Sequence, residues 1–158
     1  MIGAKLYRAA RGLFAGLVLL LAGCVQPPGP LLSGPLPPPP GTARIVFYRG
    51  LDYYATQSMP TVYLNDLPTG ISENGALFYR DLAPGVYNIS VAPSLPYPNQ
   101  FKTVVVKPGD VFYAQIAPLP TTGGKFNVNE RDYGDTFIVT LRDPAIAVYE
   151  TQGLRVSG

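Results

Sequence analysis

The sequence of 158 residues contains no histidine, no tryptophan and a single cysteine. Without an imidazole, the chain cannot build a Ser-His-Asp triad or a histidine-ligated zinc site, and it lacks the side chain that most often acts as a general base. A single cysteine cannot form an internal disulfide. Charged residues make up only 14% of the chain, and the formal net charge is +2. These absences exclude most familiar hydrolase mechanisms. They also disfavour a nucleic-acid partner, which normally requires a basic patch or stripe.

The chain also lacks an apolar run long enough to span a bilayer, although it begins with a shorter one. A spanning helix needs about 20 apolar residues, and the uncharged run from Gly12 to Val25 is clearly shorter. Lys5, Arg8 and Arg11 precede this run. Basic residues followed by a short apolar run are typical of an export signal.

The only cysteine stands near the end of this run, in the sequence Leu21-Ala22-Gly23-Cys24. This stretch resembles the bacterial lipobox at every position. The resemblance implies lipid transfer to the thiol of Cys24, cleavage between Gly23 and Cys24, and acylation of the new amine with a fatty acid such as palmitate. An ordinary secretory signal would instead end in an Ala-x-Ala-like site and leave an unpaired thiol. We therefore expect residues 1–23 to be a lipoprotein signal peptide, and lipid at Cys24 to hold the mature protein on the membrane.

Removal of the signal peptide changes the charge of the chain. Lys5, Arg8 and Arg11 leave with the signal peptide, so the mature chain has slightly more acidic than basic residues.

In bacteria with an outer membrane, an aspartate after the lipidated cysteine commonly retains a lipoprotein in the inner membrane. Because Val25 occupies that position, we expect the protein on the outer membrane, facing the periplasm.

Residues 24–41 combine the lipidated cysteine with a linker rich in proline and glycine, including the run Pro37 to Pro40. Proline at this density fixes φ, removes amide donors and favours an extended polyproline II conformation. At about 3.1 Å per residue, the linker could span at most roughly 50 Å. We expect a semi-rigid tether that separates the membrane from a domain at residues 42–158. A docking site for a proline-recognising domain is the alternative.

Residues 42–158 alternate short β-rich segments with turn signals, which predicts an all-β fold: an antiparallel β-sandwich of about seven strands. In Ala43–Arg49, Ile45 and Phe47 fall on one face and Val46 and Tyr48 on the other. The expected strands are Ala43–Arg49, Thr61–Leu64, Ala76–Tyr79, Val86–Ala92, Phe101–Val106, Val111–Ile116, a weak one at Phe126–Asn129 and Thr136–Leu141.

Three connections carry specific turn signals. Asn65-Asp66 suits a turn that requires positive φ, and Pro84-Gly85 suits a type II turn. The loop Lys107–Asp110 contains Pro-Gly and predicts a hairpin between its two flanking strands. Within Val86–Ala92, the residues Tyr87, Ile89 and Val91 should point inward.

The C-terminal segment carries the signals of a short helix. Asp143 suits the N-cap, Pro144 the first helical position, and Gly153 a stop. We expect a helix at Ala145–Thr151, and a last strand at Ala147–Thr151 is the alternative.

Three stretches carry a resemblance to known families: Ala43–Arg49, Val62–Asp66 and Leu82–Tyr87. They resemble small bacterial lipoproteins of domain of unknown function 2846. They are also similar to PEGA-type surface modules, which share the strand, turn and Pro-Gly-x-Tyr arrangement. The resemblance covers roughly residues 43–116 and implies a β fold. It implies no catalytic residue.

Tyrosines in the expected loops are the best candidates for a binding surface. Tyr53, Tyr54 and Tyr97 lie in such loops, where a ring could stack on a sugar or an aromatic ligand. The alternative is ordinary packing at a sheet edge, because tyrosine is a favoured strand residue.

The densest group of carboxylates is Glu130, Asp132 and Asp135, beside Arg131. Paired carboxylates can hydrolyse glycosides or bind calcium, but this spacing matches no calcium-binding loop and fits a solvated turn. Gly123-Gly124 lacks the rest of a phosphate-binding loop. We therefore expect no enzyme activity, no metal and no cofactor.

The composition and the lipobox together predict a lipid-anchored envelope protein. Its domain should act as a non-catalytic interaction or structural module that contacts another envelope protein or the cell wall, with no nucleic-acid partner. The alternative is a small-ligand or carbohydrate-binding lipoprotein that uses Tyr53, Tyr54 and Tyr97.

Overall fold

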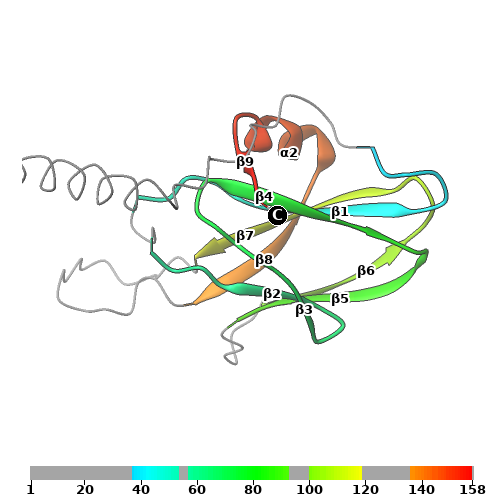
Figure 1. Ribbon diagram of the computed structural model, residues 1–158, viewed down its shortest axis with the longest axis horizontal. Coiled ribbons are helices and arrows are strands. Elements are labelled where there is room, and N and C mark those ends of the chain that lie inside the picture. The colour runs from blue at the N-terminus through cyan, green and yellow to red at the C-terminus, as the bar shows by residue number, and fades with distance from the viewer. Residues whose placement is uncertain (1–36, 54–56, 93–99, 119–135, 158) are drawn as a thin grey trace, which may run out of the picture.

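The computed structural model describes residues 37–53, 57–92, 100–118 and 136–157. They form two sheets and one short helix (Figure 1). The first sheet has the strand order β8-β7-β1-β4-β9, and the second has the order β3-β2-β5-β6. The elements are β1 (Ala43–Arg49), β2 (Thr61–Leu64), β3 (Leu67–Ile71), β4 (Ala76–Leu82), β5 (Gly85–Val91), β6 (Phe101–Val106), β7 (Val111–Pro118), β8 (Phe137–Arg142), α2 (Pro144–Thr151) and β9 (Arg155–Val156).

The two sheets pack face to face, and α2 covers the opposite side of the first sheet (Figure 1). This arrangement confirms the predicted all-β sandwich with a short C-terminal helix. The core between the sheets contains apolar residues from both of them, among them Ile45, Phe47, Val62, Phe78, Ile89, Val91, Val104, Ile116 and Val139. A second, smaller core lies between the first sheet and α2 and includes Val46, Tyr48, Leu77, Tyr113, Ala147 and Leu154.

β1 is the central strand of the first sheet, and all seven of its residues are buried. Ile45 and Phe47 belong to the core between the sheets, whereas Val46 and Tyr48 belong to the core under α2. The predicted division of faces is therefore confirmed. Because both faces of the strand are covered, no residue of β1 is left for solvent.

The expected purely antiparallel arrangement is wrong in two places. β1 pairs with β7 in parallel, and β4 pairs with β9 in parallel. The chain builds all four strands of the second sheet between β1 and β7, and β7 then enters the first sheet at the end where β1 began. The first sheet is therefore mixed, and the described residues form nine strands where about seven were expected.

The predicted hairpin at Phe101–Ile116 is also wrong. β6 pairs with β5 in the second sheet, whereas β7 pairs with β1 and β8 in the first. The loop between them crosses from one sheet to the other. It closes on itself and on the start of β1: the amide of Lys107 donates to Asp110 Oδ2, and the amide of Gly109 donates to the carbonyl of Thr42, each at 2.8 Å.

Local turn and cap signals gave mixed results. Asn65 and Asp66 have φ of 50° and 63°, which confirms the turn between β2 and β3. Gly85 does not adopt positive φ, so the type II turn is wrong there. The reason is that β4 and β5 belong to different sheets, and the chain crosses between them without reversing within one sheet. The inward positions of Ile89 and Val91 are confirmed.

The C-terminal helix is confirmed as α2, and the alternative strand at Ala147–Thr151 is wrong. The Asp143 side chain accepts a bond of 2.8 Å from the amide of Ala145, and Pro144 begins the helix. Gly153, with φ of 76°, allows the chain to turn into β9. The weak strand predicted at Phe126–Asn129 lies outside the described residues.

Gly70 in β3 provides a direct test of the packing. A Cβ at this position would lie 2.5 Å from Cε2 of Phe78, whose ring stacks on Phe47 with the two centroids 4.9 Å apart. The ring cannot move without disturbing the core. We expect Gly70→Ala to lower the free energy of unfolding by about 1–3 kcal/mol in a urea titration. Gly85→Ala is the control, because its Cβ would have no neighbour closer than 3.5 Å and its φ is not positive. Equal stability of the two variants would contradict the described packing.

Candidate interaction surface

The structure places one of the three candidate loop tyrosines. Tyr53 follows β1 and is 80% exposed. Tyr54 and Tyr97 lie outside the described residues. So do Gly23 and Cys24, the carboxylates Glu130, Asp132 and Asp135, and the pair Gly123-Gly124. Tyr53 therefore supports an exposed loop ring, and the other predictions at these positions stay predictions.

The two ends of the sandwich differ. We call the end where β1 and β7 start the entry end, because residues 37–42 lead into β1 there. The amide and Oγ1 of Thr42 donate to the carbonyl of Pro39 at 3.1 and 2.8 Å, and this tight turn fixes the direction in which the chain enters the domain. We call the opposite end, where β1 and β7 finish, the far end. Tyr53 lies after the far end of β1.

Arg49, the last residue of β1, is only 1% exposed at the far end. Its guanidinium lies over the ring of Phe137, 4.8 Å from the centroid, and its Nη1 donates to the carbonyl of Ser58 at 2.5 Å. Burial lowers the pKa of Arg49, and the charge of Asp52 opposes this shift. The Arg49 side chain links β1 to β8 and to the segment that precedes β2, which indicates a structural role.

A second polar group, on the side of the first sheet that faces α2, joins Tyr48, Arg142 and Glu150. The hydroxyl of Tyr48 donates to Oε2 of Glu150, and Nη2 of Arg142 lies 2.7 Å from Oε1 of Glu150. Burial, and then the bond to Glu150, raises the pKa of Tyr48. Burial would raise the pKa of Glu150 as well, but the bonds from Tyr48 and Arg142 outweigh burial and lower it. Both carboxylate oxygens are thus engaged in holding α2 on the sheet.

This network predicts loss of stability in acid. Because the folded pKa of Glu150 is lowered, its contribution is fully present above the unfolded value of about 4.3 and is lost as pH falls through the folded pKa. We expect the free energy of unfolding to fall as the pH drops below about 4.3. Glu150→Gln should lower it by about 1–2 kcal/mol at pH 7 and flatten the pH dependence, measured by urea titration at several pH values. Glu73→Gln is the control: its bond to Arg155 is longer, 3.4 Å, and both partners are more exposed. A Glu150→Gln variant with the wild-type pH profile would contradict this role.

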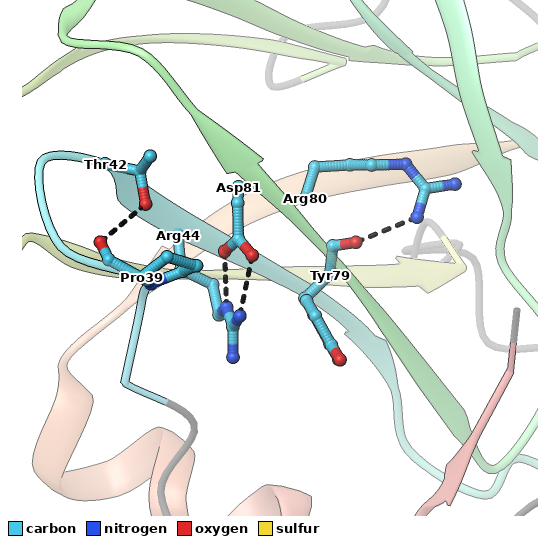
Figure 2. Close-up of polar contacts among 6 residues, drawn as sticks. All are labelled: Pro39, Thr42, Arg44, Tyr79, Arg80 and Asp81. Atoms are coloured by element: carbon cyan, nitrogen blue, oxygen red, sulfur yellow. Dashed lines mark hydrogen bonds and ion pairs between the residues drawn. The ribbon is translucent and has the colours of Figure 1, made fainter.

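A third polar group lies near the entry end, on the same side of the first sheet (Figure 2). Nε and Nη2 of Arg44 donate to the two carboxylate oxygens of Asp81 at 2.6 and 2.7 Å, and the guanidinium lies 4.0 Å from the centroid of the Tyr79 ring. The bond from Arg44 lowers the pKa of Asp81, and the same bond raises the pKa of Arg44. Both carboxylate oxygens of Asp81 accept bonds from Arg44 within the fold, so this group too is structural.

The outer face of the second sheet is different, because nothing among the described residues covers it. We define this face by the side chains that point away from the core: Thr61, Tyr63, Pro68, Ile71, Val86, Asn88, Ser90, Phe101, Thr103 and Val105. Val86 is 60% exposed, Val105 61% and Phe101 68%. No charged residue is among these described side chains. Lys102 is on the opposite face of β6, because its register partner is the buried Ile89.

An exposed apolar group of this kind on a sheet face marks a site of interaction more often than a lone exposed side chain does. The outer face carries no carboxylate, lysine, arginine or cysteine among its described side chains. Its chemistry therefore suits binding.

Within the described residues, no helix is long and apolar enough to cross a membrane. In the same part of the chain, no group of three or more cysteine, aspartate or glutamate residues is arranged to hold a metal ion. No protein-family profile, curated protein or solved structure matches the chain.

The sequence contains a signal for the outer face that lies outside its loops and motifs. In Phe101–Val106, Val104 and Val106 point into the core, whereas Phe101 and Val105 do not. β6 is an edge strand with apolar side chains on both of its faces. It therefore has more apolar side chains than its core face can bury. The exposure of Tyr53 can be predicted because this residue lies in a loop. A face built from several strands can be predicted only when the strand order is known.

Proposed function

We propose that this protein is a lipid-anchored component of the bacterial cell envelope whose domain acts by contact and not by catalysis. The observation that carries the proposal is the outer face of the second sheet. It combines exposed Val86, Phe101 and Val105 with no charged side chain among its described members. A surface of this composition costs free energy in water unless a partner covers it.

The anchoring part of the proposal rests on the lipobox at Leu21–Cys24. Val25 after Cys24 favours the outer membrane, facing the periplasm, in a host that has one. The entry end supports a defined presentation of the domain, because the turn from Pro39 to Thr42 is bonded to the loop before β7. A lipid at Cys24 would hold the domain by its entry end and direct the far end away from the membrane. Membership of the group of domain of unknown function 2846 is part of the same proposal.

The polar groups of the domain support contact over catalysis. Glu150 and Asp81 are both held in ion pairs, by Arg142 and Arg44 respectively. A carboxylate used in this way is neither a free base nor a nucleophile.

The alternative function is binding of a small ligand or carbohydrate through loop tyrosines. The observation in its favour is Tyr53, which at 80% is the most exposed tyrosine among the described residues. This alternative function would place the binding site at the far end of the sandwich.

The test is a pull-down from chemically crosslinked envelopes that uses the intact lipoprotein. We expect a partner to be recovered with the wild type and with Tyr149→Lys, which adds charge on α2, and to be lost with the double variant Phe101→Lys, Val105→Lys. The same envelopes, separated on a density gradient, should show the protein with outer-membrane markers. Recovery that is unaffected by the double variant would contradict the role of this face, and sedimentation with inner-membrane markers would contradict the proposed location.

A further inference from the structure

We propose that the outer face of the second sheet binds a neutral glycan chain. The inference deepens the proposed function, since it names the class of partner for the same face. It concerns strand residues and is separate from the loop tyrosines considered above.

The arrangement of rings and polar groups across the strands carries the proposal. Tyr63 in β2 lies opposite Ser90 in β5, and Ser90 lies opposite Phe101 in β6. The two rings therefore stand in one row, two strands apart, with a hydroxyl between them. At about 4.8 Å between strands, their Cα atoms are about 10 Å apart, so each ring could contact a different sugar of one chain.

The next row supplies hydrogen bonds. Asn88 lies opposite Thr103, whose Oγ1 donates to Oδ1 of Asn88 at 2.7 Å. This bond fixes the amide plane and leaves the amide nitrogen of Asn88 as a donor to a ligand. Sugars offer apolar C–H faces for the rings and hydroxyl groups for these polar atoms, which matches a face that alternates between the two.

The distribution of polarity argues against a protein partner. A protein interface usually has an apolar centre and a polar rim. Here the polar pair Asn88 and Thr103 lies between the apolar pair Val86 and Val105 and the row of Tyr63, Ser90 and Phe101, so the face has no apolar centre. The absence of charge among the described side chains of the face also excludes electrostatic attraction to anionic lipid.

The size of the face argues against a second copy of this chain. Four strands at about 4.8 Å, with about five residues each at 3.3 Å, give a flat area of roughly 300–400 Å². A stable protein interface buries about 800 Å² on each partner. The face is therefore too small for a stable dimer and adequate for a few sugar units.

The experiment measures cosedimentation of the mature lipidated protein, kept soluble in a polyoxyethylene detergent that carries no sugar. The probes are purified peptidoglycan sacculi and chitin, which offers a neutral glycan chain without peptides. We expect binding to both. Phe101→Ala should weaken binding about tenfold, and Tyr63→Leu, which keeps an apolar side chain, should weaken it similarly. Tyr149→Ala removes a ring that is 76% exposed on α2 and should bind as the wild type does.

Other results would overturn the proposal. Binding to neither probe, or to sacculi alone, would exclude recognition of the glycan chain. Loss of binding with Tyr53→Ala but not with Phe101→Ala would move the site to the far end. Self-association that Phe101→Ala abolishes would assign the face to a second copy of this chain. Since the measurement is made in detergent, it does not depend on anchoring, which the envelope gradient tests separately.

Discussion

Replacing Phe47 with alanine should lower the free energy of unfolding by about 3–5 kcal/mol. Phe47 is fully buried in β1, the strand between β4 and β7, and its ring stacks on Phe78. Its loss would leave a cavity in the core between the sheets. Since domains of this kind are stable by about 5–15 kcal/mol, the variant should lose a large part of its stability in a urea titration.

Phe101→Ala is the matched control for this prediction. The same side chain is removed, but Phe101 is 68% exposed on the outer face, so the change in stability should stay within about 0.5 kcal/mol. Equal losses in the two variants would show that β1 does not occupy the centre of the core.

Replacing Cys24 with serine should abolish lipidation, because no other thiol exists in the chain to accept the lipid. The precursor should remain uncleaved and migrate above the wild-type protein on a gel. The difference in lipid-mediated membrane binding between the variant and the wild type should be large. A single acyl chain binds membranes only marginally, with an association constant of about 10⁴ M⁻¹, whereas several chains make binding durable. Metabolic labelling with a radioactive fatty acid should mark the wild type alone.

Val25→Ala provides the control, since it keeps the thiol of Cys24 and should be lipidated and cleaved normally. Normal cleavage and normal labelling of Cys24→Ser would rule out the lipoprotein assignment. Val25→Asp should be lipidated too, but it should move to the inner membrane of a host that sorts by this residue.

Predictions that depended on local signals were mostly accurate. The buried pattern of Ala43–Arg49, the positive φ of Asn65 and Asp66, and the cap at Asp143 each depend on a few neighbouring residues. Strand pairing depends on the whole chain, and the pairing predicted from local sequence was wrong. Lys107–Asp110 has the composition of a hairpin loop but crosses between the sheets. Its amides bond within the loop and to Thr42, so a neighbouring partner strand is not needed to satisfy them.

Two short edge strands escaped prediction for a related reason. β3 contains Pro68 and Gly70, which weaken any strand signal, and β9 has only two residues. Both are strands because a longer neighbour offers them hydrogen bonds: β2 for β3, and β4 for β9.

The outer face could not be predicted before the strand order was known. Tyr63, Ser90 and Phe101 are far apart in the sequence and become neighbours only through the register of β2, β5 and β6. The exposed Tyr53 was predictable because loop position alone decides its exposure.

Photocrosslinking in the living cell tests most directly whether this protein acts by contact through the outer face. A photoreactive phenylalanine analogue would replace Phe101 in the lipidated protein, and Tyr149 on α2 in the control. The account predicts a high-mass adduct from position 101, reduced in mass by a glycan hydrolase, and no such adduct from position 149. No adduct from position 101, or equal adducts from both positions, would contradict it.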